Sequence, residues 1–174
     1  LGRNDRLFID SISISFQYLV GGPTSEKTTL LDLSTPAAAG FLAGNPTGHD
    51  SDGTGSGAGF SQITSMASLG PWTYVSTLYT IKKLNAETGE VTTFAGDSAW
   101  AGSCVEGVSG ADVRFVQIFD LATDGRYLYV SEDCPGTAGH IRRLDLATGA
   151  STTLATGSYL RGDIEIAPNG DILV

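Results

Sequence analysis

The sequence IKKLNAETGEVTT at residues 81–93 returns 60 residues later as IRRLDLATGASTT at residues 141–153. Six of the thirteen aligned positions are identical: Ile81/Ile141, Leu84/Leu144, Thr88/Thr148, Gly89/Gly149, Thr92/Thr152 and Thr93/Thr153. A more divergent third copy lies 53 residues upstream, where Leu31, Asp32, Thr35 and Phe41 align with Leu84, Asn85, Thr88 and Phe94. Self-similarity on this scale is typical of repeat architectures, in which each copy is one supersecondary unit.

Each copy predicts four short strands in the same order. Residues 116–124 and 162–169 are apolar runs that end in Asp-Gly and Asn-Gly, and both dipeptides favour tight hairpins. Residues 126–131 form an apolar and aromatic second strand, as expected for a strand buried on both faces. The repeated segment supplies the third strand, and residues 151–155 supply the fourth. The sequence therefore predicts an all-β fold.

The third strand does not alternate strictly, because Ile141 and Leu144 are three residues apart. A β-bulge would reconcile this spacing with a strand. The paired bases Lys82-Lys83 and Arg142-Arg143 lie on these strands, so one of each pair is expected to face a neighbouring blade or its carboxylates. The glycine-rich loops 44–59 and 96–110 separate the units, and loops of this length are usually functional or compactly folded.

Composition narrows the classes of function. The chain has 174 residues, with 41% hydrophobic and 17% charged residues, as in an ordinary globular protein. Its net charge is −9, and an acidic surface repels phosphate backbones, so we expect no nucleic acid partner. No apolar stretch approaches the roughly 20 residues of a membrane helix, so we expect no membrane insertion. The chain does not begin with Met, and we expect a processed chain or a segment of a longer protein.

Several motifs together resemble the NHL repeat: Phe94-Ala95-Gly96, Arg114-Phe115, Asp124-Gly125, Leu128-Tyr129-Val130 and Ala147-Thr148-Gly149. The Asn-His-Arg that usually precedes the third strand of that repeat is absent. The resemblance implies an all-β fold, a β-propeller segment of four-stranded antiparallel blades, with residues 1–174 as a single segment. Its units are expected near residues 9–43, 61–96 and 115–156, with a partial unit at 162–174. The ring is therefore not expected to close within this chain.

The propeller arrangement has a consequence for the two cysteines. Cys104 lies in an inter-blade loop and Cys134 between the second and third strands of a blade, and these loops emerge on the same face of a propeller. We expect a Cys104–Cys134 disulfide, with two unpaired thiols as the alternative. Loop disulfides suit an oxidising compartment, which predicts an extracellular or secreted protein.

Metal binding has weaker support in the sequence. Asp50 and Asp52 stand in an Asp-x-Asp-Gly segment that resembles a calcium loop, but the later bidentate glutamate of an EF-hand is missing. The same segment is also a common turn without metal, so we expect no cofactor and keep calcium as the alternative. The metal-dependent lyase branch of the NHL family uses several histidines, whereas this chain has only His49 and His140.

NHL proteins bind proteins, peptides or RNA, and one branch is a metal-dependent lyase. We expect a non-catalytic extracellular module for protein binding or self-association. An exposed Trp100 in the long loop would be its contact anchor, and the alternative is a Trp100 ring packed over the blade edge. One alternative is a structural subunit of an extracellular filament or wall. Another is a fragment of a propeller enzyme of the lyase or lactonase kind, in which Asp120, Asp163 and Glu165 would line a channel and hold calcium.

Overall fold

The computed structural model describes residues 15–16, 29–30, 41–46, 48–99, 102–136 and 139–174. Contacts divide the chain into two compact units, Leu1–Gly40 and Phe41–Val174. In the first unit, β1 (Ser15–Phe16) pairs antiparallel with β2 (Thr29–Leu30). Most of the unit expected near residues 9–43 lies outside the described residues, so its four strands stay a prediction.

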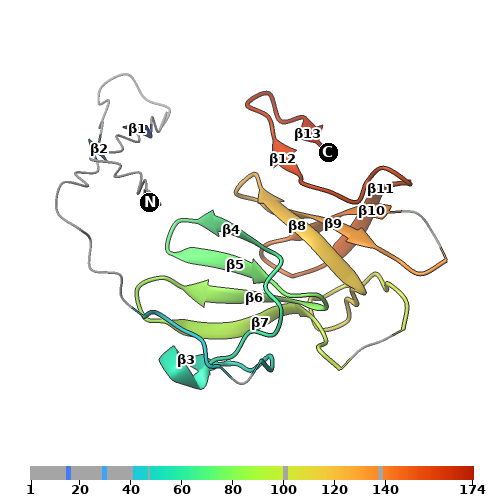
Figure 1. Ribbon diagram of the computed structural model, residues 1–174. Coiled ribbons are helices and arrows are strands. Elements are labelled where there is room, and N and C mark those ends of the chain that lie inside the picture. The colour runs from blue at the N-terminus through green and yellow to red at the C-terminus, as the bar shows by residue number, and fades with distance from the viewer. Residues whose placement is uncertain (1–14, 17–28, 31–40, 47, 100–101, 137–138) are drawn as a thin grey trace, which may run out of the picture. The chain divides into compact units, whose positions relative to one another are not determined.

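The second unit contains two larger antiparallel sheets and a further strand pair (Figure 1). The first sheet has the order β3-β7-β6-β5-β4, with β3 (Gly53–Thr54), β4 (Ser65–Leu69), β5 (Trp72–Ser76), β6 (Thr80–Asn85) and β7 (Glu90–Gly96). The second has the order β11-β10-β9-β8, with β8 (Gln117–Thr123), β9 (Tyr127–Asp133), β10 (Gly139–Asp145) and β11 (Ser151–Gly157). The last pair is β12 (Glu165–Ile166) and β13 (Ile172–Leu173).

Successive sheets meet along their first strands. β4 contacts β8, and β8 contacts β12. From this contact outward, the strands of each blade follow chain order, β4 to β7 in the first blade and β8 to β11 in the second. This is the arrangement of β-propeller blades, and the predicted fold class is confirmed. Among the described residues of the second unit, two complete blades and one strand pair are present, and they do not close a ring.

One hydrophobic core fills the space between the two blades. Tyr74, Ile81 and Ala95 contribute to it from the first blade, and Phe115, Leu128 and Leu144 from the second; these six residues are at most 3% exposed. The rings of Tyr74 and Phe94 pack in a T-shaped arrangement, with their centroids 5.2 Å apart. Burial of apolar surface between blades is the main favourable term for their packing.

The three-residue spacing of Ile141 and Leu144 reflects burial on both faces of the strand. β10 pairs with β9 in unbroken register, so residues an odd number apart point to opposite faces. Leu144 belongs to the core between the blades, whereas Ile141 is equally buried but lies outside that core. The bulge expected in the third strand therefore does not explain this spacing: the register shifts beside Ile141 and Ile81 place the extra residue on the fourth strands, β11 and β7.

The loops that lead into the two described blades, named inter-blade loops after the sequence prediction, are closed by backbone pairing in their described parts. The first contains β3 and the 3₁₀ turn η1 (Gly55–Gly57), and it is closed by a bridge between Ser51 and Gly59. The second is closed by the corresponding bridge between Val105 and Arg114. These pairings give both loops the packed form that their length predicts.

Candidate functional site

An acidic residue of each inter-blade loop contacts the buried base of the following blade. In the first blade, Lys82 donates hydrogen bonds to Asp52 at 2.9 Å and to the Thr93 hydroxyl at 2.8 Å. Thr93 in turn donates to Asp52 at 2.8 Å. Although burial raises the pKa of Asp52, the hydrogen bonds from Lys82 and Thr93 outweigh it and leave that pKa below its ordinary value.

The second blade repeats this arrangement with larger side chains. Nη2 of Arg142 lies 3.5 Å from Glu106 and donates to the Ser151 hydroxyl at 2.8 Å. Glu106 also accepts hydrogen bonds from the hydroxyls of Ser151 and Thr153. Burial raises the pKa of Glu106, but these two hydrogen bonds outweigh it and lower the pKa. One base of each pair therefore faces carboxylates, as predicted.

Arg142 also forms a buried ion pair with Glu132. Its Nη1 donates to Oε1 of Glu132 at 2.9 Å, and the two residues are 1% and 0% exposed. The guanidinium further donates to the backbone carbonyls of Arg114, at 2.9 Å, and Val105, at 2.7 Å. Burial raises the pKa of Glu132 to about 7, although the charge of Arg142 acts in the opposite direction. One side chain thus joins the third strand to the loop and to the second strand.

A second attachment joins each loop to its blade, two residues before the acidic residue that contacts the buried base. In the first blade, Oδ2 of Asp50 accepts hydrogen bonds from the hydroxyls of Thr77, at 3.0 Å, and Thr80, at 2.9 Å. Its Oδ1 accepts from the backbone N–H of Ser61 at 2.7 Å. Asp50 and Asp52 therefore serve different partners. The calcium alternative remains a prediction.

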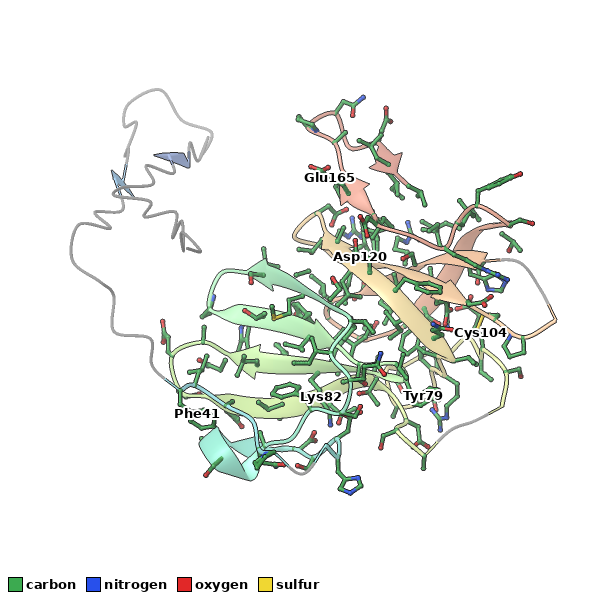
Figure 2. All side chains as sticks on the ribbon, viewed as in Figure 1. Phe41, Tyr79, Lys82, Cys104, Asp120 and Glu165 are labelled. Carbon is green, nitrogen blue, oxygen red and sulfur yellow. A yellow bond between two sulfur atoms is a disulfide. The ribbon has the colours of Figure 1, made fainter. Side chains whose placement is uncertain are left out.

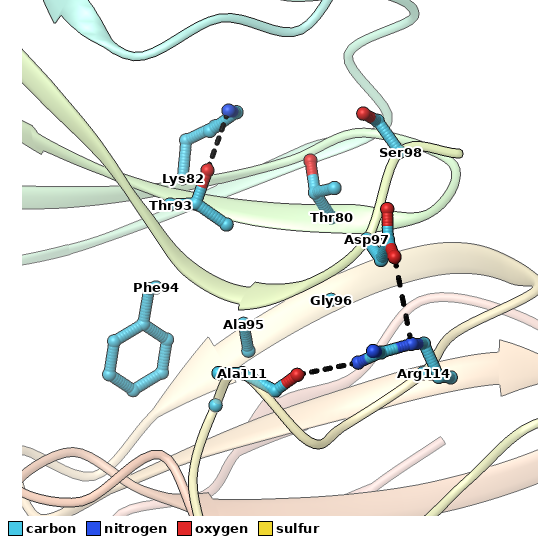
Figure 3. Close-up of a pocket in the computed structure, with 11 residues that line it drawn as sticks. Thr80, Lys82, Thr93, Phe94, Ala95, Gly96, Asp97, Ser98, Ala111 and Arg114 are labelled. Atoms are coloured by element: carbon cyan, nitrogen blue, oxygen red, sulfur yellow. Dashed lines mark hydrogen bonds and ion pairs between the residues drawn. The ribbon is translucent and has the colours of Figure 1, made fainter. Parts of the chain in front are cut away.

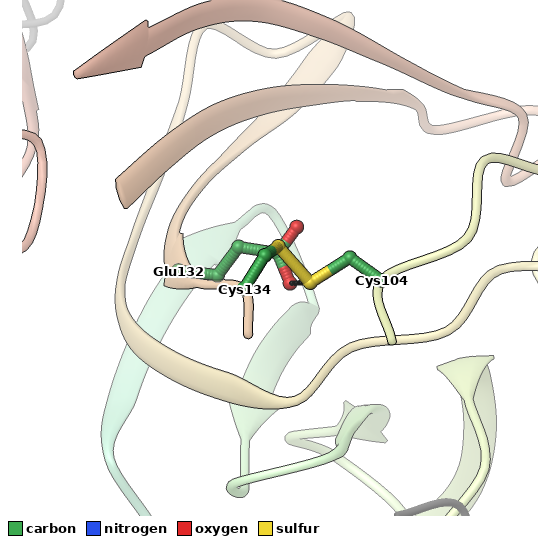
Figure 4. A group of neighbouring side chains, drawn as sticks. All are labelled: Cys104, Glu132 and Cys134. Carbon is green, nitrogen blue, oxygen red and sulfur yellow. Dashed lines mark hydrogen bonds between the residues drawn. A yellow bond between two sulfur atoms is a disulfide. The ribbon is translucent and has the colours of Figure 1, made fainter. Parts of the chain in front are cut away.

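In the second blade, the position equivalent to Asp50 is Cys104, and here the attachment is covalent. Cys104 forms a disulfide with Cys134, with the Cα atoms 5.7 Å apart (Figure 4). The expected pairing is therefore present in the structure. Sγ of Cys104 lies 3.3 Å from Oε2 of Glu132, and since a disulfide sulfur has no hydrogen to donate, this is a packing contact. Nδ1 of His140 lies 3.3 Å from Sγ of Cys134.

A pocket of about 320 Å³ lies between β7 and the second loop (Figure 3). Its charged lining residues are Lys82, Asp97 and Arg114. Lys82 is held by Asp52, while Nε of Arg114 lies 3.8 Å from Asp97 and its Nη1 donates to the Ala111 carbonyl at 2.6 Å. These charges are thus already paired within the protein, so the pocket offers hydroxyl and backbone groups more than net charge.

The three carboxylates proposed for a channel line one pocket of about 510 Å³ beside β12. Figure 2 shows Asp120 and Glu165 on β8 and β12, whose strands are in contact. Asp120 accepts hydrogen bonds from the Ser65 hydroxyl and, at 2.8 Å, from the backbone N–H of Ile164. Asp120 therefore links β8 to β4 and to the residue just before β12. Asp163 and Glu165 are the more exposed carboxylates of the pocket.

Other expectations have mixed outcomes. Trp100 lies outside the described residues, so its role as a contact anchor stays a prediction. The most exposed aromatic side chain in the described part of the chain is instead Tyr159, 95% exposed, just after β11. Sequence reasoning missed Glu106 and Glu132. Glu106 could have been found by aligning it with Asp52. Each is followed by glycine, and each precedes a blade whose third strand carries a pair of basic residues.

Among the described residues, no helix is long and apolar enough to cross a membrane.

Comparisons with known proteins add little to this description. No protein-family profile matches the sequence, and no curated protein matches it. Among solved structures, the chain is similar to the PQQ-bound form of aldose sugar dehydrogenase from Streptomyces coelicolor, with a TM-score of 0.47 and 19% sequence identity. The match covers 66% of this chain and 37% of the dehydrogenase, so the chain spans little more than a third of that enzyme. The fold assignment rests on the strand topology described above.

Proposed function

We propose that this chain is a non-catalytic, extracellular β-propeller module of NHL type, which binds a protein partner or a second copy of itself. The observation that carries the proposal is the double fastening of each inter-blade loop to its blade. Loops held in one conformation lose little conformational entropy when a partner binds, and this favours binding. The disulfide supports an oxidising, extracellular location.

A partner would best contact the second blade at the end that carries the disulfide. Tyr159 follows the end of β11, where Gly157 pairs with Gly139 at the start of β10. Arg161, close by in sequence, forms an ion pair with Asp133 at 2.8 Å. Tyrosine combines a large contact area with a hydrogen-bonding hydroxyl, and it is enriched at protein interfaces.

Site-specific photo-cross-linking tests this proposal. A benzoyl-phenylalanine is placed at Tyr159 or, as the matched control, at Ala147, which is exposed at the opposite end of β10 and β11. Irradiation of the secreted protein in its native medium should give a defined protein adduct from position 159 only. A mass-spectrometric identification distinguishes a second copy from another protein. Equal adducts at both positions, or none at position 159, would contradict the proposal.

The alternative, a fragment of a metal-dependent propeller enzyme, is favoured by one observation, the pocket shared by Asp120, Asp163 and Glu165. Both oxygens of Asp120 accept hydrogen bonds within the protein, which leaves two carboxylates for a ligand. A calcium titration of the wild type and of Asp163→Asn decides between the two. Stabilisation by calcium that the variant loses would favour the enzyme, and no effect on either protein would favour the binding module.

A further inference from the structure

Four side chains of the kind that bind zinc converge where the second loop meets its blade. Cys104, Cys134 and Glu132 bring their sulfur and oxygen atoms within 4.8 Å of one another (Figure 4). His140 adds a nitrogen, because its Nδ1 lies 3.3 Å from Sγ of Cys134. Glu132 and His140 are directly opposite each other on β9 and β10, so their side chains share one face of the sheet.

We propose that reduction of the Cys104–Cys134 disulfide turns this loop attachment into a binding site for one Zn²⁺ ion, held by Cys104, Cys134, His140 and Glu132. The site would exist before the disulfide forms or after it is reduced. In the oxidised protein the same residues form the covalent attachment described above.

The spacing of the ligand atoms suits a tetrahedral ion. Zinc binds sulfur at about 2.3 Å and histidine nitrogen or carboxylate oxygen at about 2.0–2.2 Å, which places neighbouring ligand atoms of a tetrahedral site roughly 3.3–3.8 Å apart. Two of these separations are already present, since Cys104 Sγ to Glu132 Oε2 and Cys134 Sγ to His140 Nδ1 both measure 3.3 Å. The two sulfur atoms must separate, which reduction of their bond permits, and the His140 ring must move closer, because its nitrogens are not within 4.8 Å of all three other ligand atoms.

The loop remains in place without the disulfide. The backbone of Val105, next to Cys104, exchanges hydrogen bonds with Arg114 at 3.1 and 3.0 Å. Glu106, the following residue, is held by Arg142 and by the Ser151 and Thr153 hydroxyls. These contacts keep Cys104 close to the blade, so the ligands do not have to be assembled from a free loop.

Arg142 orients the carboxylate and balances the charge of the site. It binds Oε1 of Glu132 at 2.9 Å and leaves Oε2 on the side of the sulfurs. Such outer partners fix the orientation of ligands in metal sites. Two thiolates and one carboxylate balance the charges of Zn²⁺ and the Arg142 guanidinium, which is important because Glu132 and Arg142 are almost completely buried.

The chemistry balances with a dithiol as reductant. The dithiol transfers two electrons and two protons to the Cys104–Cys134 bond, giving two protein thiols and one oxidised, cyclic dithiol. Zinc then displaces the two thiol protons as it binds the sulfurs. The reverse reaction takes a small-molecule disulfide as oxidant, which accepts the two electrons and two protons from solvent and becomes two thiols, while the ion is released and the Cys104–Cys134 bond re-forms.

The experiment compares oxidised and reduced protein under argon. The protein is treated with dithiothreitol, desalted, mixed with Zn²⁺ and dialysed, and bound zinc is measured by elemental analysis. We expect one ion per reduced chain and none per oxidised chain. Cobalt(II) should give the sulfur-to-metal charge-transfer absorption of a tetrahedral thiolate site.

Variants identify the ligands. His140→Ala should weaken zinc binding by roughly tenfold or more, while His49→Ala, which changes the other histidine of the chain at an exposed position, should leave the affinity unchanged. Glu132→Gln should weaken binding and alter the cobalt spectrum. A reduced chain that stays folded by circular dichroism but takes up no zinc would overturn the proposal. So would unfolding of the reduced chain in the presence of zinc, or equal affinities in the two histidine variants.

Discussion

The pH dependence of stability should depend strongly on Glu132. This side chain has no exposed surface, and burial raises its pKa from 4.5 to about 7 in the folded protein. The folded chain therefore binds a proton more tightly than the unfolded chain. The resulting stabilisation is fully present below pH 4.5 and is lost as the pH rises through about 7. At about 1.4 kcal/mol for each pH unit between the two pKa values, the loss amounts to about 3 kcal/mol.

Glu132→Gln removes this titration and keeps the shape of the side chain. Urea unfolding of the oxidised proteins between about pH 4.5 and about pH 8 gives the free energy of unfolding for each. The wild type should lose about 3 kcal/mol relative to the variant across this range. Other groups cancel in the comparison, since both proteins carry them. Asp52 and Glu106, whose pKa values are lowered, mainly affect stability at more acidic pH.

A second variant, Glu87→Gln, controls for the loss of a carboxylate, because Glu87 is exposed in the turn between β6 and β7. It should follow the wild-type curve. A constant difference between wild type and Glu132→Gln at every pH would refute the reasoning. It would mean that Glu132 stays ionised throughout and that the attraction of Arg142 exceeds the cost of burial.

Three further variants and one control test the attachment of the loops by urea unfolding. Replacing Cys104 and Cys134 together by serine opens a cross-link between residues 30 apart, and the free energy of unfolding should fall by about 3–4 kcal/mol in the chain-entropy relation. Asp50→Asn weakens the acceptor for two buried threonine hydroxyls and should cost about 1–3 kcal/mol. Gly149→Ala should destabilise by more than about 1 kcal/mol, since φ is 73° and a Cβ would lie 2.5 Å from a backbone nitrogen. Gly136→Ala, with φ of 76° but open space around it, should cost less.

The repeated segment was sufficient to predict the blades. Its strands and turns follow from local rules: polar residues and glycine at turns, and apolar residues in strands. The bulge was expected in the third strand but lies on the fourth. The side chains of Asn85 and Asp145 each accept hydrogen bonds from the backbone N–H groups two and three residues further along the chain. Gly89 and Gly149 end these turns with positive φ. The hairpin expected around Asp124-Gly125 differs in detail, because only the glycine has positive φ.

The attachment of the loops was harder to predict, because it depends on contacts between distant residues. Glu132 reads in the sequence as an acidic residue near the end of a strand, a position that is usually exposed. Its burial follows from the loop that covers it and from Arg142, which lies ten positions further along the chain. No local pattern reports desolvation, so a pKa near 7 could not be inferred from sequence. The equivalence of Asp50 and Cys104 was hidden because their chemistry differs.

That equivalence changes how the disulfide is interpreted. The first blade fastens the same loop position with three hydrogen bonds to Asp50, so the fold itself does not require a covalent bond there. The second blade has a buried carboxylate at Glu132, where the first blade has the hydroxyl of Thr77. A carboxylate at the position of Cys104 would place two negative charges together in a buried site, which is costly. The sulfur of Cys104 avoids this repulsion in the disulfide, because it carries no charge when it is bonded to Cys134. After reduction, the two thiolates would need a cation to balance their charge beside Glu132.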